Sequence, residues 1–259
     1  MKYLSRCLAL LLVAAMAVLA GCAGAPQGAF EAYEAAMEKF DSLESLHATQ
    51  DVKAKVSVSG VSVDVPVKAD LKIGKDGSMS MSMEMSVLGM TMEIPMYYAD
   101  DVLYMEMFGM KVKMPVTDEL LEEEMDVDSV TPQFNLPEEA LKDASFEKKD
   151  GNTVYSAEFD GQLIAEELLE LVTPSLENAG EDVVLSSVTF GAIKYSYTID
   201  KNGYLAEQNL VFSITFTADG TEASGEFDMT FKLVDAGKDV TPDKPADLSE
   251  YQDLSDIEF

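Results

Sequence analysis

A regular alternation of apolar and polar residues limits the folds open to this chain. Between residues 48 and 114, valines, methionines and other apolar residues recur at every second position, with serine, lysine or acidic residues between them. Successive side chains of a β-strand point to opposite faces, so this spacing predicts strands with one apolar and one polar face. Short turns at Gly60, 74–77, 88–89 and 99–101 interrupt the runs. The segment therefore predicts an antiparallel meander of about five strands. The fifth is expected over Val102–Met114, with a bulge at Phe108-Gly109.

Alternating segments return in the C-terminal half of the chain. A hairpin is expected over residues 145–159, turning at Asp150-Gly151-Asn152, followed by long strands over 183–200, 204–217 and 221–234. Apolar residues at three- and four-residue spacing predict a helix over 29–46. Further helices are expected at 117–125, 137–143 and 162–178, with Pro174 kinking or ending the regular part of the last. Because strands and helices form separate groups, the pattern predicts the α+β class.

The first 22 residues have the features of a bacterial export signal that ends in a lipidation site. Lys2 and Arg6 precede an uncharged stretch that runs from Leu8 to Leu19. That stretch is shorter than the roughly 20 apolar residues that a membrane-spanning helix needs. Leu19-Ala20-Gly21-Cys22 resembles the bacterial lipobox. The resemblance implies cleavage before Cys22 and a covalent diacylglyceryl lipid on its sulfur.

Four segments follow from these features. We expect a signal peptide at 1–21, a lipidated tether at 22–28, one folded domain at 29–236 and an acidic tail at 237–259. Two or three acyl chains make a stable membrane anchor, whereas a single chain binds only marginally. The membrane is therefore the expected partner through Cys22, and the extracytoplasmic face of the cell membrane is the expected location.

Charge and residue usage exclude several classes of function. The 48 acidic and 18 basic residues give a net charge of −30, which nucleic acid would repel. After cleavage Cys22 would be the only cysteine, so neither a disulfide nor a thiolate metal site is expected. His47 is the single histidine, and the chain lacks a Gly-x-Ser-x-Gly motif. We therefore expect no enzyme and no cofactor beyond the covalent lipid.

Methionines are concentrated in the first meander. Residues 79–114 contain 11 of the 16 in the chain, most of them spaced for one sheet face. Three interpretations stay open: a filled core, a pliable cavity for a lipid or other hydrophobic ligand, and capture of Cu(I) by thioethers.

The layout resembles the LolA-like superfamily of bacterial lipoproteins, in its LppX–LprG-like branch. The resemblance rests on the lipobox, the helix over Phe30–Leu46, the long meandering strands, the segment Tyr195–Leu205 and the closing stretch Pro245–Tyr251. It implies a strongly curved antiparallel sheet, an incomplete barrel with helices packed on its concave, open side. It also implies carriage of an acyl-chain ligand in a cavity between sheet and helices.

Two functions are therefore carried forward. The first is hydrophobic ligand binding in such a cavity, with the helix at 162–178 as a candidate lid. The second is a structural or interaction role in the envelope, with the interior filled by the protein's own side chains. For the first, the expected cavity-lining residues are Met79, Met81, Met83, Met85, Met90, Met92, Met105, Met107, Ile164, Leu168 and Leu171.

Overall fold

A computed structural model describes residues 28–87, 89–116, 140–165, 185–218 and 221–256 of the chain. Within these ranges there is one α-helix, α2 (Ala29–Asp41), and a single sheet of thirteen strands. The first six strands are β1 (Leu46–Val58), β2 (Val61–Ile73), β3 (Met79–Val87), β4 (Met90–Ala99), β5 (Val102–Met107) and β6 (Met110–Pro115). The others are β7 (Leu141–Lys149), β8 (Asn152–Phe159), β9 (Leu185–Phe190), β10 (Ile193–Ile199), β11 (Leu205–Ala218), β12 (Thr221–Val234) and β13 (Gln252–Asp253).

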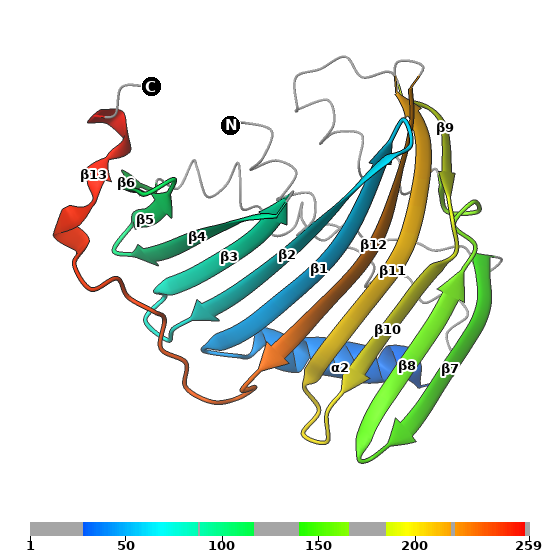
Figure 1. Cartoon of the computed structure of the whole chain (residues 1–259). Helices are drawn as coiled ribbons and strands as arrows, with labels where there is room; N and C mark the ends of the chain where they lie inside the picture. Colours follow the sequence, from blue (N-terminus) through cyan, green and yellow to red (C-terminus); the bar gives the residue numbers. More distant parts are fainter. Residues whose placement is uncertain (1–27, 88, 117–139, 166–184, 219–220, 257–259) are drawn as a thin grey trace.

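The sheet is built from two meanders that meet at its centre. Its spatial order is β13-β6-β5-β4-β3-β2-β1-β12-β11-β10-β8-β7, with β9 added beside β11. The joint is the antiparallel pair of β1 with β12, whose register runs without a break from His47 opposite Val234 to Val58 opposite Ala223. Figure 1 shows the result, a large curved sheet that does not close on itself. The predicted α+β class and incomplete barrel are confirmed, with fewer helices among the described residues than expected.

Alternation along the strands separates an apolar face from a polar face, because residues opposite each other in a register share one face. The apolar face carries the core, and α2 lies against it, behind β10 and β11 in Figure 1. The polar face carries charged and hydroxyl side chains, joined by cross-strand ion pairs such as Lys53 with Asp228. The largest fully buried side chains are those of Val52, Tyr155, Phe159, Ile164, Tyr197 and Met229.

The stretch from Val102 to Met114 is two strands rather than one bulged strand. β5 and β6 pair antiparallel, from Val102 opposite Pro115 to Met107 opposite Met110. Phe108 and Gly109 form the turn between them, and both have a positive φ. Two residues with positive φ make a tight hairpin turn that reverses the chain, which explains why the alternation changes phase here.

Three other element boundaries differ from expectation. The helix predicted over 137–143 is wrong for its last part, because β7 begins at Leu141 and pairs with β8. The strand predicted over 183–200 is interrupted at Gly191 and Ala192, which separate β9 from β10. The first helix ends at Asp41, since Leu46 already begins β1. The helix predicted at 117–125 and most of that at 162–178 lie outside the described residues.

The C-terminal segment runs back along the sheet and is fastened to its polar face. Lys72 pairs with Asp243 at 2.6 Å, and the amide of Asp243 donates to the hydroxyl of Ser80. Further on, β13 pairs parallel with β6, and the buried Tyr251 packs its ring edge-on against Tyr104. No helix in the described ranges is both long and apolar enough to cross a membrane.

Candidate functional site

Methionines from three neighbouring strands form a continuous apolar surface, here called the methionine wall. In the register Met81 lies opposite Met96, and Met96 lies opposite Met105, so a row of thioethers crosses β3, β4 and β5. A second pair is Met85 opposite Met92. The wall consists of Met79, Met81, Met83 and Met85 of β3, Met92 and Met96 of β4, and Met105 and Met107 of β5.

Burial decreases across the wall from the centre of the sheet outward. Met83 and Met85 are buried members of the main core. Met81, Met92 and Met96 are half-buried and pack against that core. The remaining members, Met79 of β3 and Met105 and Met107 of β5, are also half-buried. The wall therefore joins the packed interior on one side and stays partly accessible on the other.

The other residues predicted to line a cavity fall in different places. Met90 lies at the tip of the β3–β4 hairpin with 72% of its surface exposed, so it stands apart from the wall. Ile164 is fully buried in the core, just after β8. Leu168 and Leu171 lie outside the described residues, as does Cys22.

The opposite half of the apolar face is filled by tyrosine rings. Tyr197 stacks on Tyr155 at 5.0 Å between ring centroids and meets Tyr33 of α2 at 5.3 Å. Its hydroxyl donates to the backbone carbonyl of Ala29, at the start of α2. This cluster was not predicted from the sequence, although Tyr155, Tyr195 and Tyr197 occupy alternating core positions in β8 and β10. The rings in this half of the sheet are thus buried in the main core.

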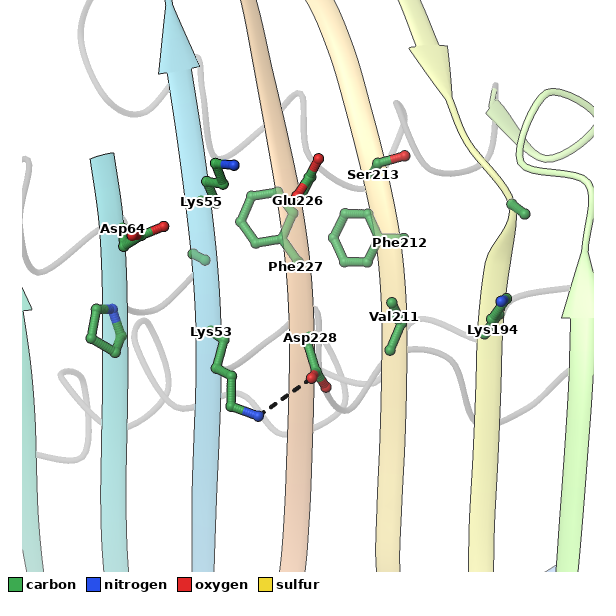
Figure 2. A pocket seen from close by; sticks show the side chains of 13 residues that line it. Lys53, Lys55, Asp64, Lys194, Val211, Phe212, Ser213, Glu226, Phe227 and Asp228 are labelled. Carbon is green, nitrogen blue, oxygen red and sulfur yellow. Dashed lines mark hydrogen bonds and ion pairs between the residues drawn. The ribbon is translucent and has the colours of Figure 1, made fainter. Parts of the chain in front are cut away.

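The polar face carries two hollows among the described residues. The larger, about 750 Å³, crosses five adjacent strands from β2 to β10. Figure 2 shows its charged lining, in which Lys53 lies 3.5 Å from Asp228. A smaller hollow of about 360 Å³ lies over β12, β1, β2 and β3. Both are open, lined by charges of both signs, and lie on the face opposite the methionine wall.

Metal-binding groupings are not found in the described ranges. These ranges contain no group of three or more histidine, cysteine or acidic residues arranged to hold a metal ion. His47 is the only histidine of the chain, and its Nε2 atom lies 3.1 Å from Oδ2 of Asp70 on the polar face, so the two side chains form a pair. The methionine wall is therefore the candidate surface for a ligand among the described residues.

Comparisons with known proteins give one family and several similar solved structures. Residues 29–241 match the model of a family described as a family of unknown function, DUF6612. No curated protein matches the chain. Among solved structures, LprF from Mycobacterium bovis is 15% identical, with a TM-score of 0.33, covering 86% of this chain and all of that one.

Two further solved structures are similar over most of the chain. A putative outer membrane lipoprotein-sorting protein domain from Vibrio parahaemolyticus is 10% identical, with a TM-score of 0.27, covering 79% of this chain and 93% of that one. A LolA superfamily protein from Nitrosomonas europaea is 11% identical, with a TM-score of 0.22, and the match covers 78% of this chain and 93% of that one. LolA-superfamily and lipoprotein-sorting structures are thus among the structural neighbours, as the sequence resemblance predicted.

Proposed function

The chain belongs to the family of unknown function DUF6612, and we propose that it is a lipid-anchored lipoprotein of the extracytoplasmic membrane face that binds a hydrophobic ligand. Cys22 carries the anchor, and the methionine wall forms one side of the ligand site. The protein acts by binding and is not an enzyme.

The observation that carries this proposal is the partial burial of the methionine wall. Met81, Met96 and Met105 form a row in which each side chain is half-buried beside a fully packed core. Methionine has three rotatable bonds and a polarisable sulfur, so such a surface can adapt to apolar partners of different shape. The tyrosine cluster, by contrast, has no accessible surface to offer. Ligand binding is therefore assigned to the β3–β5 half of the apolar face.

A direct test is to look for the ligand on the protein itself. The full-length protein is purified from its own membranes in mild detergent and examined by native mass spectrometry. We expect extra mass from a non-covalent hydrophobic molecule, in addition to the covalent lipid. Protein that carries only its covalent lipid, and that also fails to bind a fluorescent fatty acid, supports the filled-core alternative.

Substitutions in the wall test the site. The triple variant Met81→Gln, Met96→Gln, Met105→Gln places three amides on the row, where an apolar ligand would leave them without hydrogen bonds. We expect its affinity for the fluorescent fatty acid to fall at least about tenfold. The matched control is Met90→Gln, which makes the same chemical change at an exposed tip. Equal affinities in the two proteins would remove the wall from the site. Far-ultraviolet circular dichroism shows whether the triple variant keeps its sheet.

The anchor is tested separately by metabolic labelling. Cells that express the protein are fed an alkyne-tagged palmitate, and we expect label on the wild-type chain and none on Cys22→Ser. The variant should also leave the membrane fraction. A labelled Cys22→Ser chain would show that the lipid sits elsewhere, without bearing on the methionine wall.

A further inference from the structure

The hairpin turns at the two rims of the sheet differ in chemistry. In a meander, the turns β1–β2, β3–β4 and β5–β6 lie at one rim, and the turns β2–β3 and β4–β5 lie at the other. Figure 1 shows this arrangement, since the arrowheads of β1, β3 and β5 all point to its upper edge. The lower rim is charged, with Lys75, Asp76, Asp100 and Asp101 in its turns, Asp150 at the tip of β7–β8 and Lys201 at the tip of β10–β11.

The upper rim is apolar over the three hairpins from β1 to β6. Val61 is 67% exposed at the first tip, Met90 at the second, and Phe108 is 64% exposed at the third. Val58 and Met110 beside these tips are also exposed. Isolated exposed apolar residues are ordinary on protein surfaces, whereas a row of them along one rim indicates an interaction surface. We call this row the apolar rim.

Charge is also absent from the first two tips. Residues 56–63 and 85–92 form two runs of eight without a charged residue, in a chain of which 25% is charged. The polar side chains in these runs include two hydrogen-bonded pairs of hydroxyls, Ser57 with Ser62 and Ser86 with Thr91. At the third tip, Lys111 forms ion pairs with both Glu106 and Glu250. The first two tips are therefore an uncharged part of the surface of an acidic protein.

Phe108 adds a conformational argument. Its φ is +52°, the same as that of Asp100 and Asp150, which hold the equivalent position in turns at the opposite rim. This left-handed conformation suits aspartate, asparagine and glycine, and it is unfavourable for a bulky side chain. An aromatic ring held there, and exposed, is therefore retained at a cost in stability. Strain of this kind is concentrated at functional positions.

We propose that the apolar rim docks on a lipid bilayer, with the side chains at the tips of β1–β2, β3–β4 and β5–β6 entering the interface. The three tips are separate points along a curved rim rather than one flat patch. A bilayer accepts such points without matching their shape, whereas a protein partner needs a complementary surface of about 800 Å². The charged turns of the lower rim then face away from the membrane. Glu222 at the tip of β11–β12 limits the contact to the β1–β6 half of the rim.

The chain contains no tryptophan, so one introduced tryptophan reports its own position. The full-length lipidated protein carrying Phe108→Trp is reconstituted into vesicles of phosphatidylcholine brominated along its acyl chains. We expect its fluorescence to fall about twofold or more relative to unbrominated vesicles, because the ring reaches the acyl boundary. The matched control is Lys201→Trp, at an exposed turn of the lower rim, which should keep its fluorescence. Met90→Trp, at a tip without the left-handed constraint, should behave like Phe108→Trp.

Equal quenching of the upper-rim and lower-rim tryptophans, or none at either, would overturn the proposal. So would shielding from aqueous acrylamide in native membranes but not in pure lipid vesicles, which would assign the rim to a protein partner. The docking goes beyond the proposed function, since it needs no bound ligand. Recovery of protein with the vesicles reports the Cys22 anchor, and quenching reports the rim, so the two proposals fail separately.

Discussion

The hydroxyl of Tyr197 donates a 2.7 Å hydrogen bond to the backbone carbonyl of Ala29, joining the middle of β10 to the first turn of α2. Both residues are buried. The bond fixes the beginning of the helix against the apolar face of the sheet, next to the ring contact between Tyr33 and Tyr197.

Removing that hydroxyl tests how strongly α2 is held. We expect Tyr197→Phe to lower the free energy of unfolding by about 1 kcal/mol, because the ring packing stays and a single buried hydrogen bond is lost. Urea denaturation followed by circular dichroism measures the change. The matched control is Tyr98→Phe, which removes an exposed hydroxyl bonded to Asp101 and should cost less than about 0.5 kcal/mol. Equal losses of unfolding free energy in the two variants would show that the buried Tyr197 bond contributes no more than the exposed Tyr98 bond.

Tyr251 makes the C-terminal segment sensitive to alkaline pH. Burial, together with the nearby Glu106 carboxylate, raises the pKa of the Tyr251 phenol to about 12. In the unfolded chain this phenol ionises at its ordinary pKa of about 10. The contribution of Tyr251 to stability is therefore complete below pH 10 and lost as the pH rises through 12. Between these values, the stability of the wild type should fall more steeply than that of Tyr251→Phe.

A spectroscopic titration checks the same assignment. Absorbance at 295 nm follows tyrosinate formation, and Tyr251→Phe should remove a component that titrates near pH 12. Loss of a component near pH 10 instead would place the Tyr251 phenol in water and contradict its burial against Glu106.

Phe108→Asn should make the protein more stable while weakening its contact with lipid. Asparagine tolerates the left-handed backbone of this position, so we expect a gain of about 1 kcal/mol in the free energy of unfolding. Thermal unfolding measures the gain. Phe108→Leu is the control, since it keeps a bulky apolar side chain and should leave stability nearly unchanged. A loss of stability in Phe108→Asn would mean that the ring packs on the folded chain.

The length of the tether should decide whether the anchor and the apolar rim reach one bilayer. Seven residues from Cys22 to Gly28 span at most about 24 Å. From Gln208, opposite Tyr197, to Ala218 at the upper rim is about 33 Å along β11, which a barrel-like tilt reduces to a height of about 25 Å. The two lengths nearly match. Deleting Gly24-Ala25-Pro26 should therefore abolish quenching of Phe108→Trp by brominated lipid.

Replacing the same three residues by three serines keeps the length and should keep the quenching. If the shortened tether is quenched as strongly as the serine variant, the rim and the anchor are not coupled through the length of the chain.

How much of the fold the sequence predicts depends on which interactions are local. Strands β11 and β12 lie within a residue of expectation, because regular alternation and a tight turn are read from neighbouring residues. The pairing of β1 with β12 has no such local signal, since alternation identifies a strand and leaves its partner undetermined. The turn at Phe108 was misjudged because phenylalanine is uncommon in the conformation that the turn requires.

The candidate site also combines features that local spacing predicts with contacts that only the assembled sheet shows. Period-two spacing placed Met79 to Met85 on one face, and the register brings them beside the methionines of β4 and β5. It also included Met90, because spacing alone does not show that a residue sits at the end of its strand. The ring contact of Tyr197 with Tyr33 joins residues far apart in the chain, and it becomes visible only when the sheet is assembled.

The joint between β1 and β12 has a consequence for the order in which the molecule is made. The partners His47 and Val234 are separated by most of the domain, so the sheet stays in two pieces until nearly the whole chain is available. A polypeptide threaded through a membrane from its N-terminus would therefore leave the exporting machinery with the inner edge of β1 bare. The C-terminal strands, which are made last, therefore complete the sheet.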